Sequence, residues 1–200
     1  MFNMINLPDI AKVMLKKGYA FFEKADKPFN LNIIGIRSSN NKPDSFDDII
    51  TVSWKYKAGW NFLKFIATTD PGLYWLNNPM NIKGTAILLP GQYRGAFKKG
   101  AHKGYPALVQ CGQLKIVRDY DRDNEFDYYY NEVEISTNDG INIHRASPTI
   151  ESTIVNKWSA GCQVIANPDE FNVFMAVIDA SLRYWPNSFT YTLLLEEDFY

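Results

Sequence analysis

The chain has 200 residues, of which 46% are hydrophobic and 15% aromatic, so it can bury one sizeable core. Lys and Arg number 21 and Asp and Glu number 22, and the net charge of -1 excludes a chain-wide electrostatic attraction to nucleic acid or to an anionic membrane. The first residues lack the features of a secretory signal, and no window holds the ~18 apolar residues of a membrane span. We therefore expect a chain made in soluble form in the cytoplasm, without membrane insertion.

Residues 1–30 predict a short helical prefix. Ile10, Val13 and Met14 recur at helical spacing, with Pro8 near the start of the pattern and Gly18 near its end. We expect this amphipathic helix to pack as a lid or prefix on one domain formed by residues 31–200.

From Leu31 onward the pattern changes to short apolar, β-branched or aromatic runs, separated by clusters of Gly, Pro, Asn and Asp. Runs of this kind predict strands and therefore a mainly β domain. They read LNIIGIR, DIITVSWKY, WNFLKFIATT, KGTAILL, ALVQCGQLKIVRDY, DYYYNEVEI and INIHR, with FTYTLLLEE near the C-terminus.

One helix is expected after the last of the central runs, over residues 168–185. Asn167 can cap it, Pro168 suits its first position, and Asp169 and Glu170 favour its positive N-terminal end. An apolar stripe follows at helical spacing, formed by Phe171, Phe174, Met175, Ile178, Leu182 and Trp185.

Residues 141–166 contain one of the two histidines and one of the two cysteines of the chain, His144 and Cys162. A thiol is only a few per cent thiolate at pH 7, so a nucleophilic cysteine needs a neighbouring base. The runs INIHR and CQVIA read as two strands joined by a loop, which would let His144 face Cys162 across neighbouring strands. Gly161, directly before the cysteine, would permit backbone N–H groups to stabilise an oxyanion.

His144, followed by 14 residues and then Ser159-Ala160-Gly161-Cys162, resembles the signature of the L,D-transpeptidase (YkuD-type) family. The resemblance covers roughly residues 68–185, and only this His…Ser-x-Gly-Cys core is specific. It implies a β-sandwich-like catalytic domain in which Cys162 attacks a peptide carbonyl of a peptidoglycan stem peptide and forms a thioester. His144 would take the thiol proton, Gly161 and Cys162 would offer backbone donors, and Ser159 would orient the loop.

The chain also departs from the family pattern. Ala160 stands where the family has a second histidine, and Val164 stands where it usually has Arg or Asn, with Gln163 adjacent. We expect Gln163 and Arg145 to bind substrate. Arg145 or Lys157 would pair with the carboxylates of the stem peptide. Trp158 would either line the substrate groove or anchor the loop.

The resemblance implies that the acyl group of the thioester passes to water or to an amine. The absence of the family's histidine at position 160, where this chain has alanine, favours hydrolysis over cross-linking. No cofactor or metal is required by this chemistry. The site of action would be the cell wall, as for a phage-encoded lysis protein or a wall enzyme carried by the virion. The alternative is a wall-binding or structural module of a phage particle that keeps the scaffold without turnover.

Other residues have plainer readings. Two histidines plus Cys162 could in principle hold zinc, but no His-x-x-x-His or Cys-x-x-Cys spacing supports a zinc hydrolase. Cys111 is expected to be a core residue, although a bridge between the two cysteines stays open. His102 is expected to be a solvated residue of a Gly/Lys-rich loop, with a role in contacting the substrate or supporting the site as the alternative. Asp119, Asp121 and Asp123 are spaced like the carboxylates of a calcium-binding loop. The segment lacks the glycine and the final glutamate of such a loop, so we expect a solvated acidic turn.

Overall fold

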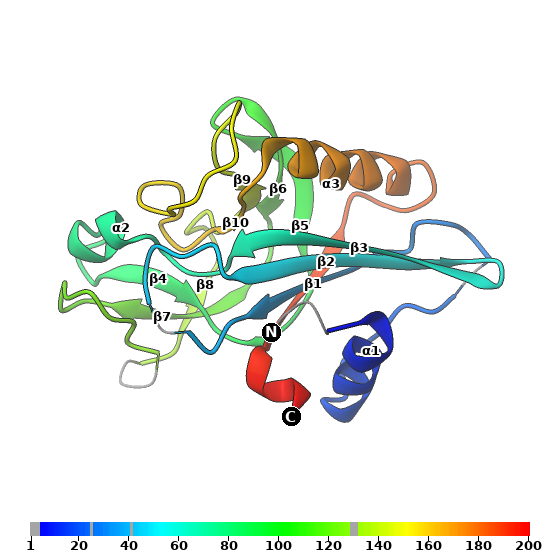
Figure 1. The fold of residues 1–200 in the computed structure, drawn as a ribbon, viewed down its shortest axis with the longest axis horizontal. Helices are drawn as coiled ribbons and strands as arrows, with labels where there is room; N and C mark the ends of the chain where they lie inside the picture. Colours follow the sequence, from blue (N-terminus) through cyan, green and yellow to red (C-terminus); the bar gives the residue numbers. More distant parts are fainter. Residues whose placement is uncertain (1–4, 25, 41, 129–131) are drawn as a thin grey trace.

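The computed structural model describes residues 5–24, 26–40, 42–128 and 132–200. Its elements, in chain order, are α1 (Leu7–Lys16), β1 (Asn32–Arg37), β2 (Asp48–Tyr56), β3 (Gly59–Thr68), α2 (Leu73–Asn77), β4 (Thr85–Leu88), β5 (Gly91–His102), β6 (Tyr105–Gln110), β7 (Leu114–Asp119), β8 (Glu134–Ser136), β9 (Ile143–Arg145), β10 (Gln163–Ile165), α3 (Pro168–Ser181), β11 (Phe189–Leu195) and the 3₁₀ helix η2 (Glu196–Phe199). Eight strands form a closed barrel in the order β1-β11-β5-β6-β9-β10-β3-β2, and β4, β7 and β8 form a separate sheet (Figure 1).

The prediction of a mainly β chain with a short N-terminal helix and a helix after Cys162 is confirmed. The arrangement of the strands differs from the expected β-sandwich. Two parallel pairings, β1 with β11 and β9 with β10, join edges that a sandwich would leave apart, so the larger sheet closes on itself.

Helix α1 forms where the apolar spacing predicts it. The Asn6 side chain caps it by accepting a hydrogen bond from the Asp9 N–H at 3.0 Å, and Gly18 follows its end at φ +69°. Its buried face packs on the outer side of the barrel, and the residues of this small core are Ile10, Val13, Met14, Ile34, Ile36, Ile49 and Leu194. In Figure 1 the helix lies on the opposite side of the barrel from α3.

Strand β5 is the barrel strand that the sequence did not predict, and the short helices α2 and η2 were not predicted either. Its twelve residues read GQYRGAFKKGAH, with little β-branched character and with three glycines. It forms because both neighbours hold it, β6 on one side and β11 on the other. The predicted run ALVQCGQLKIVRDY is likewise divided into β6 and β7, and the predicted run DYYYNEVEI lies partly outside the described residues, at 129–131.

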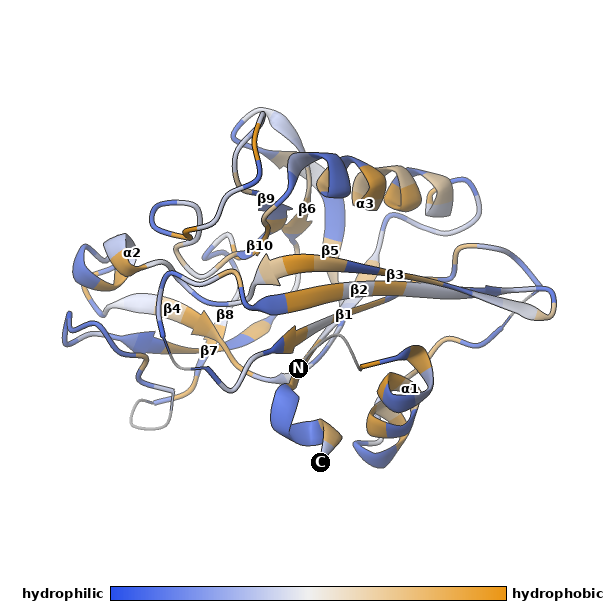
Figure 2. Cartoon of the chain, viewed as in Figure 1, coloured by the Kyte–Doolittle hydropathy of each residue, from blue (hydrophilic) through white to orange (hydrophobic). Residues whose placement is uncertain are grey.

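Helix α3 covers one end of the barrel beside β9 and β10. The Asn167 side chain accepts hydrogen bonds from the Asp169 and Glu170 N–H groups, at 2.9 and 3.3 Å. The helix ends at Ser181, a turn earlier than expected. Figure 2 shows apolar residues along the central parts of β2 and β3 and on α3, and hydrophilic residues in most connecting loops. Within the described ranges, no helix is both long and apolar enough to cross a membrane.

Asn167→Ala removes the cap that starts α3. We expect the free energy of unfolding to fall by about 1 kcal/mol, because two N–H groups of the first turn lose their acceptor. Chemical denaturation followed by far-UV circular dichroism measures this. Asn167→Ser serves as the control, because serine keeps a cap acceptor and, like alanine, loses the hydrogen bond that the Asn167 amide donates to Glu151. It should retain most of the stability, and equal losses in both variants would contradict the capping role.

Candidate active site

Strands β9 and β10 bring His144 and Cys162 to one face of the barrel wall. The strands run parallel, and His144 is the register partner of Val164. Side chains two residues apart on a strand share a face, so Cys162, directly before β10, lies on the same face as Val164 and His144. The two side chains therefore lie on one face of neighbouring strands, offset by two residues along the register.

The His144 ring is almost fully buried and has a defined tautomer. Its Nδ1 lies 2.7 Å from the backbone oxygen of Arg145, which can only accept, so Nδ1 carries the proton. The Tyr105 hydroxyl is 3.2 Å from the same nitrogen. Nε2 is left with a free lone pair, which is the form of a general base. Burial, with His102 nearby, lowers the pKa of His144 to about 3, so the ring is neutral at neutral pH.

The Cys162 thiol rests in a hydrogen-bonded position of its own. The Asn142 N–H donates to Sγ at 3.5 Å, and Sγ donates to the Gly140 oxygen at 3.4 Å. Burial raises the pKa of Cys162 to about 11, although the Asn142 N–H acts in the opposite direction. Among the described residues no hydrogen bond joins this thiol to His144, so the resting pair is a neutral thiol beside a neutral imidazole.

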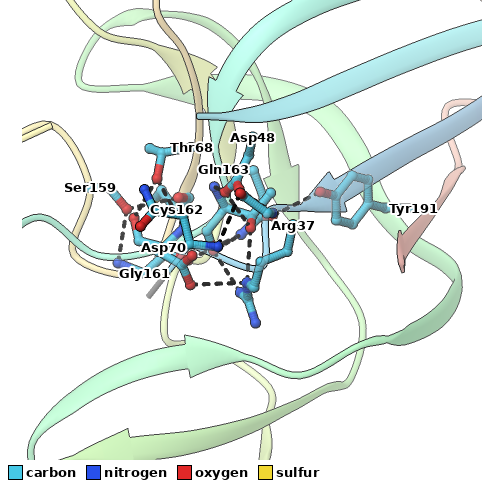
Figure 3. Close-up of polar contacts among 12 residues, drawn as sticks. Arg37, Asp48, Thr68, Asp70, Ser159, Gly161, Cys162, Gln163 and Tyr191 are labelled. Atoms are coloured by element: carbon cyan, nitrogen blue, oxygen red, sulfur yellow. Dashed lines mark hydrogen bonds and ion pairs between the residues drawn. The ribbon is translucent and has the colours of Figure 1, made fainter. Parts of the chain in front are cut away.

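The loop before Cys162 is fixed by Ser159 and Gly161 (Figure 3). Ser159 Oγ donates to the Cys162 oxygen at 2.8 Å and accepts from the Gly161 N–H at 3.2 Å. Gly161 has φ +109°, and a Cβ there would stand 2.3 Å from the Ala86 oxygen, so only glycine fits. The Gly161 N–H, expected as an oxyanion donor, is therefore already engaged within the loop.

Gln163 does not line a substrate groove, contrary to expectation. It is the next residue after Cys162 and points to the opposite face, into the barrel, where it is fully buried. The Tyr191 hydroxyl donates to its Oε1 at 2.8 Å, and its Nε2 donates to the Thr69 oxygen at 3.3 Å (Figure 3). Its role is to hold the inner side of β10.

His102 belongs to the site and is not a solvated loop residue. It ends β5, and a tight turn with positive φ at Lys103 and Gly104 pairs it with Tyr105 at the start of β6. Its ring stacks on His144, with centroids 4.1 Å apart and planes within 10°. As the only other histidine of the chain it could have been suspected, but the unpredicted strand β5 is what carries it there.

Arg145 and Trp158 both keep part of their side chains accessible to solvent. The Arg145 guanidinium lies over the Tyr105 ring, 4.2 Å from its centroid, and forms none of the ion pairs found within the described ranges. Trp158 is 39% exposed, and Lys157 lies over the Tyr74 ring. Ala160, in the same loop, lines a cavity of about 200 Å³ together with Met80, Arg118 and Asp139.

The expected burial of Cys111 and the expected exposure of the whole acidic turn are both corrected by the structure. Cys111 is exposed, because the chain leaves β6 at Gln110 and turns outward, and both cysteines are free. Asp119 is fully buried, whereas Asp121 and Asp123 are exposed, so the acidic turn is solvated only in part. Among the residues that the structure describes, no group of three or more His, Cys, Asp or Glu side chains could hold a metal ion.

Gly161→Ala should disrupt the loop that presents Cys162. The added methyl group meets a backbone oxygen that cannot move aside freely, and the positive φ is strained for alanine. We expect a loss of roughly 2 kcal/mol or more in unfolding free energy and of Cys162-dependent activity. Thermal unfolding and thiol alkylation measure the two effects. Gly104→Ala, at a positive φ in open space, controls for backbone strain alone, and equal behaviour of both variants would refute the close-contact argument.

Asp119→Asn should stabilise the chain at alkaline pH. Burial raises the pKa of Asp119 from 3.8 to about 6, so folding opposes its ionisation and stability is lost as the pH rises through about 6. The neutral amide avoids this loss. We expect a gain of about 1–3 kcal/mol at pH 8 that vanishes below about pH 4. Urea titrations at both pH values measure it, and a gain of equal size at both would show that ionisation is not the cause.

No protein-family model, no curated protein and no solved structure matches this chain. Function must therefore be argued from the site itself and from the motif that surrounds Cys162.

Proposed function

We propose that the chain is a cysteine-dependent enzyme that transfers or hydrolyses acyl groups of peptidoglycan stem peptides, in the manner of an L,D-transpeptidase or L,D-carboxypeptidase. One observation carries the proposal. His144 and Cys162 share a face of two adjoining strands, and His144 is held in the tautomer that leaves Nε2 free to accept a proton.

The reaction begins when the Cys162 side chain turns away from the Gly140 oxygen and gives its proton to His144 Nε2. The thiolate attacks the carbonyl of the scissile peptide bond, and the leaving amine takes the proton back from His144. A thioester on Cys162 results. Water or an acceptor amine, deprotonated in turn by His144, then releases the acyl group and restores the thiol.

The surroundings support a substrate that carries carboxylates. The charged side chains that act on His144 are Lys103 and Arg145, both cationic, and Arg145 has a guanidinium free of protein carboxylates within the described ranges. Arginine pairs bidentately with carboxylates such as those of stem peptides. Ala160 offers no proton-transfer group to an acceptor amine, which favours water as the acceptor and therefore hydrolysis.

The second candidate is a wall-binding or structural module of a phage particle on the same scaffold. The neutral resting state of Cys162, with its raised pKa and its hydrogen bond to Gly140, favours this reading, because a committed nucleophile usually has a lowered pKa. Under either reading we propose that the chain acts at the cell wall.

The test is incubation of purified disaccharide-tetrapeptide with the wild-type protein, followed by mass spectrometry. We expect loss of the terminal D-Ala, abolished in Cys162→Ala and reduced by ~10² to 10⁴ in His144→Ala, because general-base assistance contributes that much to the rate. Cross-linked dimers or D-amino-acid exchange would identify a transpeptidase instead.

Cys111→Ala is the matched control, because Cys111 is the other free cysteine and lies outside the site. It should keep wild-type turnover. If Cys162→Ala still cleaved the substrate, the proposed nucleophile would be wrong. If neither the tetrapeptide nor a cross-linked dimer changed, the binding or structural reading would replace the enzyme.

A further inference from the structure

A second imidazole is built into the site by an element far from the Cys162 motif. His102 comes from the tip of the β5–β6 hairpin, and its ring covers the ring of His144 face to face. The hairpin reaches β9 through the pairing of Leu108 with Ile143. The motif itself carries alanine at position 160, so this ring is the only other imidazole that the chain can offer.

Asn142 connects His102 to the thiol. Its Oδ1 accepts from the Gln110 N–H at 2.9 Å, which fixes the orientation of the amide. Its Nδ2 therefore points at His102 Nδ1, 3.0 Å away, and must donate to it. The backbone N–H of the same residue donates to Cys162 Sγ, and its oxygen accepts from the Gln163 N–H.

This orientation defines the state of His102. A nitrogen that accepts a hydrogen bond from an amide carries no proton, so the observed arrangement requires a neutral His102. A proton on Nδ1 would place two donors against each other and break the contact with Asn142. It would also put a positive charge on a ring whose centroid lies 4.1 Å from that of His144. The His144 ring must itself become cationic during the proposed catalysis, so the two charges would repel each other.

We propose that His102 is a positioning residue that lets His144 accept the Cys162 proton only while His102 itself is neutral. The neutral ring offers its π face to the His144 imidazolium and holds Asn142 against the thiol, whereas a protonated His102 repels the imidazolium and releases Asn142. The inference rests on the proposed Cys162–His144 pair and does not depend on which substrate the pair acts on.

The other groups that face His102 are Lys103 on the hairpin, Tyr105 on β6, and His144 and Arg145 on β9. Burial and then Lys103 lower the pKa of His102, which favours the neutral ring. The Cys162 thiol adds its own ionisation to any pH profile, so the effect of His102 has to be measured against a variant that lacks this imidazole.

The test measures the alkylation rate of Cys162 by iodoacetamide from about pH 4 to 9, in a Cys111→Ala background so that one thiol reacts. Because the thiolate fraction of Cys162 falls with pH in every variant, the quantity compared is the ratio of the wild-type rate to the His102→Phe rate at each pH. His102→Phe keeps a ring face but cannot be protonated, so the two rates should agree within about threefold at pH 7.5, and the ratio should fall on the acidic side, where the wild-type His102 becomes protonated. His102→Ala should lose about tenfold at pH 7.5, because no ring then faces the imidazolium.

Lys103→Gln provides a second, independent test. Lys103 lowers the pKa of His102, and also those of His144 and Cys162, so its effect is measured on the ratio of the wild-type rate to the His102→Phe rate, with both proteins carrying Lys103→Gln. The acidic fall of this ratio should move to higher pH. If the ratio stayed constant between about pH 4 and 9, the pH dependence would not belong to His102, and the proposal would be overturned. Equal losses in His102→Phe and His102→Ala with an unchanged pH profile would also overturn it, since His102 would then only support packing.

Histidine NMR of the same variants assigns the titration directly. The chain has only two histidines, so His102→Phe leaves a single imidazole signal, and its chemical shifts show that the variant is folded. The wild-type spectrum should show one ring that protonates together with the acidic fall of the rate ratio. Turnover of the tetrapeptide is a separate readout: if alkylation follows His102 while the tetrapeptide stays intact, the proposed substrate fails and the role of His102 stands.

Discussion

The short parallel pairing of β9 with β10 is the constraint on which the rest of the molecule depends. It spans only three residues in each strand, yet it closes the barrel and sets His144 and Cys162 on one face. A slip of one residue would turn Cys162 to the interior and bring Gln163 out, because the side chains of a strand alternate. The glycine at 161, pressed against the Ala86 oxygen, and the hydrogen bond between Asn142 and Gln163 fix this register from one end.

The inner side of β10 is fixed by buried polar groups. Gln163 contacts Tyr191 and Thr69, and Thr69 in turn binds Arg37 and Asp48 (Figure 3). Burial, with Asp70 nearby, raises the pKa of Asp48 to about 7, and Arg37 opposes that rise. A buried group of this kind contributes more to a unique arrangement than to net stability, because desolvation offsets most of the Coulomb attraction. These contacts therefore help to fix the register of β10 beneath the site.

Local pattern predicted the elements whose own residues decide their structure. Strand β2 coincides with the run DIITVSWKY, α3 begins directly after the predicted capping residue Asn167, and α1 buries the predicted residues Ile10, Val13 and Met14. The pairing of His144 with Cys162 was also foreseeable, because both residues lie within one strand–loop–strand segment. His102 was not, since β5 has weak strand propensity and exists through its neighbours. Gln163 was misplaced because a sequence run does not reveal which face of a strand meets the barrel interior. Cys111 was misplaced because β6 ends before it, at Gln110.

One of the two neighbours of β1 in the barrel is β11, and Ile33 pairs there with Tyr191, 158 residues later in the sequence. A contact between residues so distant in sequence forms late, and on the ribosome it must wait until β11 has been synthesised. Cys162 and His144 leave the ribosome before that strand. The nascent chain therefore carries both side chains for a time without the closed barrel that aligns them, and the chemistry proposed for them requires that the barrel has closed.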